Sequence, residues 1–419
     1  MKGLRKYLTP FAPDQSGAVS VLYELGGMLV ICDAGGCTGN VCGFDEPRWF
    51  ETRSAVFSAG LRDMDAILGR DDRLVAKLAD AAEKLDVTFA AVIGTPVPAV
   101  IGTDYRALER MLAKKTELPV LTVNTDGMEL YDKGEEKAYL ALFEKFSDKN
   151  EESEDMNDKD RPRIGIIGMT PQDVSDLKAA DKIRKVYADQ GMRAICYGMG
   201  DGLDEVRNVS LAAKNVVVSP AALKAAQYLQ KKFGTPYEIA YPLASELVPE
   251  VNYQGKKILI VQQQVIANAV RKEIEKRTGE KEAITTATWF MRKEEILTDL
   301  NVDAADDISL KEEDDFISLV EKEGYDVIFD HVKFSYETGK TVLKDVSFTA
   351  KQGQVTALVG PSGGGKSTIA KLAAKFYDVD GGKITLGGAD IAKIDPVALM
   401  KDCLLYTSDA ADDLIGVDL

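Results

Sequence analysis

Residues Gly26–Phe50 read GGMLVICDAGGCTGNVCGFDEPRWF and join an apolar run to a glycine-rich loop. The run MLVIC, Met28–Cys32, has the length and composition of a buried strand. In the following AGGCTGNVCG, the glycines permit a ligand to approach the backbone closely, although one such loop is a weak signal. The stretch therefore predicts a buried strand that ends in a loop suited to a site.

The alternation of strand and helix continues on both sides of this stretch. Further strands are predicted at 89–94, 118–124, 163–168, 192–198, 215–220, 256–261 and 283–291, and helices at 72–85, 105–115, 173–190, 221–234 and 262–279. Such alternation predicts an α/β fold with parallel sheets. Between the two series, residues 147–160 hold seven acids, two lysines and almost no apolar side chain, which indicates a solvated linker.

Composition limits the classes of function. The chain has 419 residues, enough for two or three domains, and its net charge of -16 argues against a nucleic-acid partner. No apolar run reaches the roughly 18 residues that a membrane-spanning helix needs. The N-terminal MKGLRKYLTPFAPDQ has no apolar signal core. These features predict a cytoplasmic protein.

Three of the five cysteines, Cys32, Cys37 and Cys42, form a C-x4-C-x4-C pattern in the glycine-rich loop. In a cytoplasmic chain such a group favours metal or redox chemistry, and thiolates are the ligands that iron–sulfur clusters require. A cluster here would take its fourth ligand from elsewhere in the chain or from a second subunit. The alternative, that these are buried or free structural thiols, stays open. Cys196 lies on an apolar strand and is predicted to be a core residue.

A second motif, GPSGGGKST at Gly360–Thr368, fits the phosphate-loop pattern G-x-x-x-x-G-K-[ST]. It lies between a predicted strand, QVTALV, and a predicted helix, TIAKLAAKFY. Backbone N–H groups of such a loop face phosphate oxygens, while Lys366 neutralises the β- and γ-phosphates and Ser367 ligates Mg²⁺. The predicted nucleotide-binding residues are therefore Gly360, Ser362, Gly363, Gly364, Gly365, Lys366, Ser367 and Thr368, with ATP and Mg²⁺ as ligands.

Residues 328–402, including VLKDVSF and GGKITLGGADI, resemble the ATP-binding subunit of ABC exporters. By this resemblance, Tyr336 stacks on adenine, and a membrane permease is the partner if this part is functional. The glutamine loop, the LSGGQ signature, the catalytic glutamate and the switch histidine of the family do not follow in this sequence. His331 precedes the loop and is interpreted as a surface strand residue. The segment is therefore expected to bind ATP without hydrolysing it.

Residues 5–327 resemble nitrogenase component 1 and its nitrogenase-like relatives, through Gly26–Phe50 and stretches such as IGTPVPAVIGTDY and LPVLTVNTDG. The resemblance implies Rossmann-like domains around a metal-cluster cavity, here with the third domain truncated. It also implies a homo- or hetero-dimer and a separate reductase partner. Of the three family positions that often carry cluster cysteines, Pro13 and Thr95 occupy two and only Cys37 is retained. No equivalents of the molybdenum-cofactor ligands are secure, so nitrogen reduction is not supported.

The fold class predicted is therefore α/β, with two Rossmann-like parallel-sheet domains of the nitrogenase component 1 type and a partial P-loop ABC domain. The predicted boundaries are a first domain at 1–146, an acidic linker at 147–162, a second domain at 163–327, the ABC part at 328–402 and a tail at 403–419. The tail begins with CLLYTS, which one frame of a common sequencing adapter encodes, so it is interpreted as an artefact rather than a natural acidic tail.

Three functions remain open at this point: a nitrogenase-like oxidoreductase subunit of unknown substrate joined to an ABC fragment in a natural or artefactual fusion, an ATP-binding transporter module, and a non-catalytic scaffold that lost its clusters.

Overall fold

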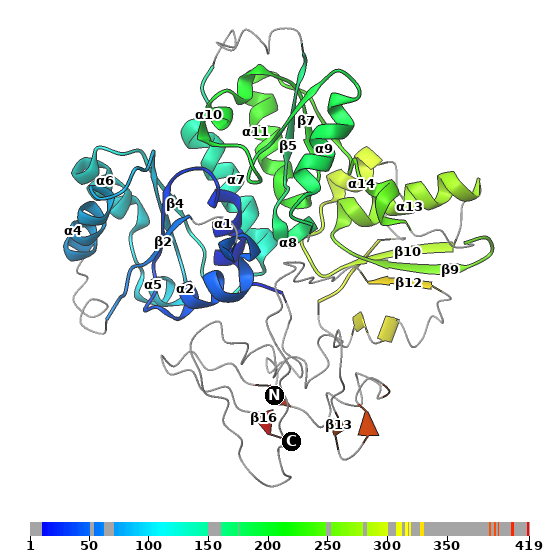
Figure 1. Cartoon of the computed structure of the whole chain (residues 1–419), viewed down its shortest axis with the longest axis horizontal. Coiled ribbons are helices and arrows are strands. Elements are labelled where there is room, and N and C mark those ends of the chain that lie inside the picture. The colour runs from blue at the N-terminus through cyan, green and yellow to red at the C-terminus, as the bar shows by residue number, and fades with distance from the viewer. Residues whose placement is uncertain are drawn as a thin grey trace. The chain divides into compact units, whose positions relative to one another are not determined.

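The computed structural model describes residues 11–50, 54–62, 71–149, 161–174, 176–248, 253–279, 283–300 and 307–311, together with shorter stretches between 315 and 418. The chain divides into two compact units, Met1–Phe334 and Ser335–Leu419. The first unit contains three four-stranded sheets in which every strand pairing is parallel, which confirms the predicted α/β fold (Figure 1).

The first sheet has the strand order β2-β1-β3-β4. Its strands are β1 (Met28–Ile31), β2 (Ala55–Ser58), β3 (Ala90–Ile93) and β4 (Val120–Val123). Parallel neighbours cannot be joined by tight hairpins, so the chain crosses over through helical segments. These are α2 (Gly36–Asn40), the π-helix η1 (Val41–Asp45), the 3₁₀ helix η2 (Pro47–Phe50), α4 (Asp71–Ala82), α5 (Pro96–Ile101) and α6 (Tyr105–Thr116).

Helices cover both faces of the first sheet. Side chains alternate between the faces along each strand, so Met28 and Val30 pack against α4 and α6, whereas Leu29 and Ile31 belong to the larger core. That larger core includes residues of α1 (Asp14–Leu22) and α7 (Tyr131–Phe146). Since α7 also contacts helix α11 (Leu223–Phe233) of the second sheet, α7 lies between the first two sheets (Figure 1).

The second and third sheets have the orders β6-β5-β7-β8 and β11-β10-β9-β12. Their strands are β5 (Arg163–Ile167), β6 (Arg193–Cys196), β7 (Ala212–Val217), β8 (Tyr237–Ile239), β9 (Lys257–Val261), β10 (Ala283–Thr288), β11 (Asp307–Ser309) and β12 (Val327–Asp330). Residues 163–327, assigned to one domain from the sequence, thus contribute to two sheets. The repeated strand–helix pattern is the same in both, so it does not show where one sheet ends.

Two local predictions differ from the structure. Strand β12 pairs parallel to β9, whereas the sequence around it predicts antiparallel strands. The predicted helix 173–190 is two helices, α8 (Pro171–Val174) and α9 (Ala179–Ala188). The Asp176 carboxylate accepts a hydrogen bond from the Lys178 backbone N–H, 2.9 Å away, and this local bond begins a new helix instead of continuing the first.

The remaining segments of the first unit connect the second and third sheets. They are α10 (Leu203–Arg207), η3 (Val209–Leu211), η4 (Pro220–Ala222), α11 (Leu223–Phe233), α12 (Ala244–Leu247), α13 (Gln264–Thr278) and α14 (Glu294–Leu300). In the second unit the described residues form two antiparallel pairs, β13 (Thr385–Leu386) with β14 (Ala389–Asp390), and β15 (Leu404–Leu405) with β16 (Val417–Asp418). No helix among the described residues is long and apolar enough to cross a membrane.

Two glycines allow α1 and α7 to pack backbone against backbone. A Cβ on Gly17 would lie 2.0 Å from the Tyr131 carbonyl oxygen, and a Cβ on Gly134 would lie 1.7 Å from the Asp14 carbonyl oxygen. Both distances are far below van der Waals contact, and the atoms met are backbone, which cannot rotate away. The close approach fixes the N-terminal turns of α7 beside α1.

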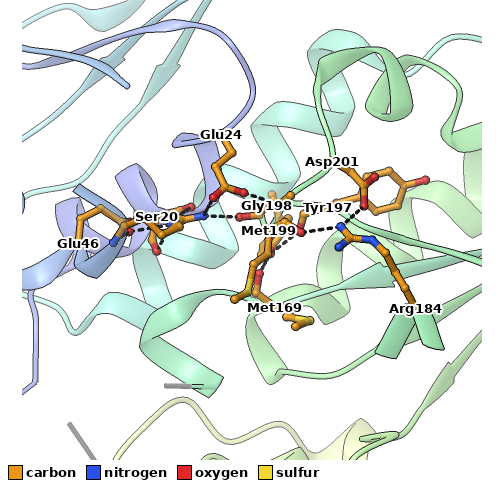
Figure 2. A network of polar contacts seen from close by, with 12 residues as sticks. Ser20, Glu24, Glu46, Met169, Arg184, Tyr197, Gly198, Met199 and Asp201 are labelled. Atoms are coloured by element: carbon orange, nitrogen blue, oxygen red, sulfur yellow. Dashed lines mark hydrogen bonds and ion pairs between the residues drawn. The ribbon is translucent and has the colours of Figure 1, made fainter. Parts of the chain in front are cut away.

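A buried arginine joins the first sheet's elements to the second sheet. Arg48, 3% exposed, donates to the carbonyl oxygens of Gly198 (2.8 Å) and Ser20 (2.6 Å) and to the Glu46 carboxylate (2.7 Å). Glu24 lies 3.7 Å from the same guanidinium. Figure 2 shows Ser20, Glu24 and Glu46 meeting the Gly198 turn in this network. Because a buried guanidinium stays charged and is costly unless its donors are paired, these contacts fix the two parts together.

Candidate functional site

The strand orders create a topological switch point at the carboxyl ends of the strands in each sheet, and in the third sheet it lies at β9, between β10 and β12. In the first sheet, β1 is followed outward by β2 on one side and β3 on the other, and in the second sheet β5 has β6 and β7 as its neighbours. Ligands of open α/β sheets bind at such points, where the chain leaves adjacent strands in opposite directions. We call the loop after β1 with the loop after β3 the first edge, and the loop after β5 with the loop after β7 the second edge.

Asp33 organises the glycine-rich loop of the first edge. Its carboxylate accepts hydrogen bonds from the Thr38 backbone N–H (2.8 Å), the Thr38 hydroxyl (3.0 Å) and the Ser58 hydroxyl (2.6 Å). The preceding turn needs a glycine at Gly35, whose φ of 121° few other residues adopt. These bonds hold α2, and with it Cys37, at the carboxyl end of β1.

The cysteines of this loop lie in different surroundings. Cys32 is 1% exposed and belongs to the core beneath α4 and α6, whereas Cys37 is half-buried and packs against the core on the opposite face of the sheet. Cys42 is half-buried in η1. Burial raises the pKa of Cys32 to about 12 and that of Cys42 to about 11. Cys196 is buried in the core, as predicted.

This arrangement does not fit an iron–sulfur cluster held by the three cysteines within one chain. In the part of the chain that the structure describes, no group of three or more His, Cys, Asp or Glu side chains could hold a metal ion. Cys32 and Cys37 pack into cores on opposite faces of one sheet, so their sulfurs do not share a site. Among the four cysteines that the structure describes, Cys37 and Cys42 retain partial exposure.

The three positions named from the family resemblance do gather at the first edge. Thr95 follows β3 and donates to the Cys32 carbonyl oxygen (2.8 Å), while Pro13 precedes α1 and forms an isolated bridge with Leu130. The Asp14 carboxylate beside it accepts from the backbone N–H groups of two residues that follow β4, Asp126 (3.1 Å) and Gly127 (2.7 Å). The topology is thus suited to a shared site, but one thiol, Cys37, occupies these three positions.

The second edge contains acidic side chains that no sequence motif indicated. The Thr170 hydroxyl, after β5, donates to the Glu135 carboxylate (2.5 Å), and the Tyr131 hydroxyl donates to the Asp173 carboxylate (2.9 Å). From the third sheet's side, the Met291 backbone N–H donates to the Asp132 carboxylate (2.5 Å). Helix α7 therefore brings buried acids to a place where segments following β5 and β10 also arrive.

These acids are hard to ionise. Burial raises the pKa of Asp132 to about 6 and that of Asp173 to about 7, and it raises the pKa of Glu135 well above the usual range. One oxygen of Glu135 and one of Asp173 have no hydrogen-bond partner in the structure. The sequence did contain a signal. Asp132, Glu135, Tyr139 and Leu142 recur at helical spacing, so acids share a face with core residues.

The predicted nucleotide site lies outside the described residues. This applies to Tyr336, to the phosphate loop Gly360–Thr368, and to His331 and Cys403. Its assignment depends on the sequence motif.

Comparisons with known proteins match two parts of the chain. A family profile described as nitrogenase component 1 type oxidoreductase matches residues 14–243. Solved structures titled "Nitrogenase Cp1 at pH 6.5" and "Nitrogenase Cp1 at pH 5" share the fold, with TM-scores of 0.56 and 0.58 at 12% and 15% identity. The alignments cover 78% and 79% of this chain and 83% and 80% of those chains.

A second profile, described as ABC transporter, matches residues 343–412. The mycobactin import ATP-binding/permease protein IrtA of Mycobacterium tuberculosis is 57% identical over 68 residues, which are 16% of this chain and 8% of IrtA. The mitochondrial iron-sulfur clusters transporter ATM1 of Saccharomyces cerevisiae is 42% identical over 95 residues, which are 23% of this chain and 14% of ATM1. The chain spans only these small shares of the curated relatives' lengths.

Proposed function

The chain belongs to the nitrogenase component 1 type oxidoreductase family, whose profile covers residues 14–243, and from this membership we propose that the first unit is an oxidoreductase subunit. Its substrate is not identified by the residues. The observation that supports this role best is the first edge, where Asp33 holds the loop of Cys37 at a topological switch point.

The thiols limit how such a subunit could work. Since Cys32 faces a closed core, any cluster at the first edge would use Cys37, with Cys42 as the nearest further thiol along the loop, and ligands from a second chain. A bound iron–sulfur cluster would supply electron transfer. The role of this chain's residues is to hold Cys37 at an exposed edge through the Asp33–Thr38 and Asp33–Ser58 hydrogen bonds.

The neighbouring surface is suited to a dimer. Helix α5 exposes Val97, Val100 and Ile101, with exposed fractions of 39%, 87% and 42%, and Met128 beyond β4 is 79% exposed. Exposed apolar side chains of this kind are typical of contact surfaces. We propose a second copy or a related subunit as the occupant, and a separate reductase as the electron donor.

Iron and sulfide analysis tests this proposal. After anaerobic cluster reconstitution of the full chain, we expect iron and sulfide in a dimeric fraction, and their loss in Cys37→Ser. Cys196→Ala is the matched control, because Cys196 is distant from the loop along the chain and is buried in the core. Iron that is absent from the wild type would exclude cluster binding.

An iron-free folded protein would instead favour the second candidate, a non-catalytic scaffold with the nitrogenase-like fold. One observation favours this candidate: the three cysteines do not converge. Under this proposal, Cys37→Ser changes neither oligomeric state nor stability, because no cluster bridges two chains. Size-exclusion chromatography of the wild type and the variant distinguishes the two candidates.

We further propose that residues 343–412 bind ATP with Mg²⁺ through the phosphate loop. The support is the ABC transporter profile and the motif with Lys366 and Ser367. Lys366 and Ser367 supply the charge and the hydroxyl that an ATP–Mg²⁺ complex requires, so we expect the chain to bind ATP. A transporter module with a permease partner is the alternative role of this segment.

Nucleotide binding by the full chain tests this assignment. Lys366→Ala is expected to weaken ATP binding about tenfold or more, since it removes the charge that neutralises the phosphates. Lys393→Ala, an exposed lysine of the same segment outside the motif, is the control. Equal affinity in Lys366→Ala and the wild type would refute the assignment, whereas phosphate release by the wild type would favour the transporter module.

A further inference from the structure

Two buried carboxyl groups meet at the second edge without enough partners for two negative charges. Glu135, on α7, is 0% exposed, and Asp173, on α8, is 6% exposed. We propose that Glu135 and Asp173 form a proton-binding site that holds one proton between them at neutral pH. The ligand of this site is the hydrogen ion itself.

Only one oxygen of each carboxyl group accepts a hydrogen bond of normal geometry. Thr170 donates to one Glu135 oxygen and Tyr131 donates to one Asp173 oxygen. Glu135 Oε2 is buried without a hydrogen-bond partner, and Asp173 Oδ2 makes no hydrogen bond of normal geometry, although the Ser219 hydroxyl lies close enough to oppose the rise of the Asp173 pKa. A buried acceptor without a donor is costly, and more so when it carries charge, so a proton on one of these oxygens removes the charge of that group and its repulsion of the other.

The surrounding charges do not compensate the two acids. Tyr131, Asp132 and Tyr139 of α7 face the pair, together with the Ser219 hydroxyl and Tyr241 beyond β7 and β8, and Arg48 of η2. Arg48 is the one cation among these groups, and its hydrogen bonds go to Glu46, Ser20 and Gly198.

The lysines around Glu135 do not pair with it either, since Lys137, two residues further along α7, pairs with Asp14 and Glu129. Lys224 and Lys293 both pair with Glu136, the residue after Glu135 on α7. The pKa of Glu136 is lowered by these pairs, which oppose its burial, whereas burial and the charge of Asp173 raise that of Glu135. At neutral pH Glu135 is therefore protonated and Glu136 is ionised, because only Glu136 is paired with lysines.

Two interacting carboxyl groups lose their protons in two separate steps, because the first charge opposes the second. The site therefore takes up a second proton as the pH falls below about 7, where Asp173 is protonated, and keeps one proton above that pH until it is released under alkaline conditions. If the first unit reduces a substrate, which depends on the proposed function, this site is a buried store of one proton at the second edge of the same unit.

Infrared spectroscopy of the full chain tests the site without substrate or cluster. The carbonyl stretch of a protonated carboxyl group is expected at pH 7.5 in the wild type, about one group per chain. Glu135→Gln should remove this signal. In Asp173→Asn the remaining acid should titrate at a lower pH than in the wild type, by about 1 unit or more, because the opposing charge is absent.

Glu136→Gln is the matched control and should leave the signal unchanged, since Glu136 is ionised by its two lysines. A folded wild type with no protonated carboxyl signal at pH 7.5 would overturn the proposal, as would a signal that persists in Glu135→Gln. Both outcomes are independent of iron binding and activity. The proton site can therefore be refuted while the oxidoreductase assignment stands, and the oxidoreductase assignment can be refuted while the proton site stands.

Discussion

The first and second edges have the same topology but differ in the hydrogen-bond partners of their acidic side chains. At the first edge, the acidic group Asp33 has a donor for each of its oxygens, and the thiols beside it range from buried to half-exposed. At the second edge, the acids are buried and two of their oxygens lack donors. A switch point therefore positions side chains without deciding their protonation, which depends on the partners that packing supplies.

Arg48 should give the largest effect, because it connects the two regions. Arg48→Met leaves Glu46 and Glu24 without their cation and Gly198 without its donor, so we expect a loss of about 3–5 kcal/mol in the free energy of unfolding. Urea denaturation measures it. The control Lys145→Met breaks an exposed pair with Glu109 and should cost less than about 1 kcal/mol. Equal losses in both variants would mean that the buried network does not join the two parts.

Glycine substitutions compare the packing at the contact between α1 and α7 with the packing of the loop at the first edge. Gly134→Ala places a Cβ 1.7 Å from the Asp14 carbonyl oxygen, and we expect about 3 kcal/mol of destabilisation because α1 and α7 must separate. Gly39→Ala, on α2 at the first edge, meets nothing within 4 Å and should be neutral or slightly stabilising. Thermal unfolding of both variants checks this, and a stable Gly134→Ala would contradict the backbone contact.

Serine substitutions test the separation of the cysteines. Cys32→Ser puts a hydroxyl among apolar side chains beneath α4 and α6, and should cost about 1–3 kcal/mol. Cys37→Ser, at a half-buried position, should stay within about 0.5 kcal/mol in the metal-free protein. Chemical denaturation under reducing conditions measures both. Similar losses would show that the two thiols share one environment.

The smallest of these changes is expected for the dependence of the free energy of unfolding on pH, measured per pH unit. The folded state raises the pKa of Asp173 from 3.8 to about 7, so between these values the folded chain retains a proton that the unfolded chain has lost. Stability therefore falls as the pH rises from about 4 to about 7, by at most about 1.4 kcal/mol per pH unit for this group.

Asp173→Asn should flatten that slope, and denaturation curves at several pH values would show it. The control Asp181→Asn changes an exposed acid on α9, for which the slope should remain that of the wild type. A slope that is identical in Asp173→Asn and the wild type would mean that Asp173 is not protonated in the folded state.

The sequence by itself determined the fold class, most of the described strands and helices of the first unit, and the two family resemblances. Period and composition suffice for these, since a buried strand such as Met28–Ile31 and an amphipathic helix such as Tyr105–Thr116 are visible in their own residues. Spacing also named Cys32, Cys37 and Cys42 together, but adjacent strand positions face opposite sides of a sheet, and the loop after a strand can turn to either side.

Only the tertiary structure decided which side chains meet. It divided residues 163–327 between two sheets, placed β12 parallel to β9, separated Cys32 from Cys37, and brought Glu135 to Asp173 across 38 positions of sequence. The physical reason is that protonation and ligand binding depend on burial and on partners from distant segments, which no local pattern contains.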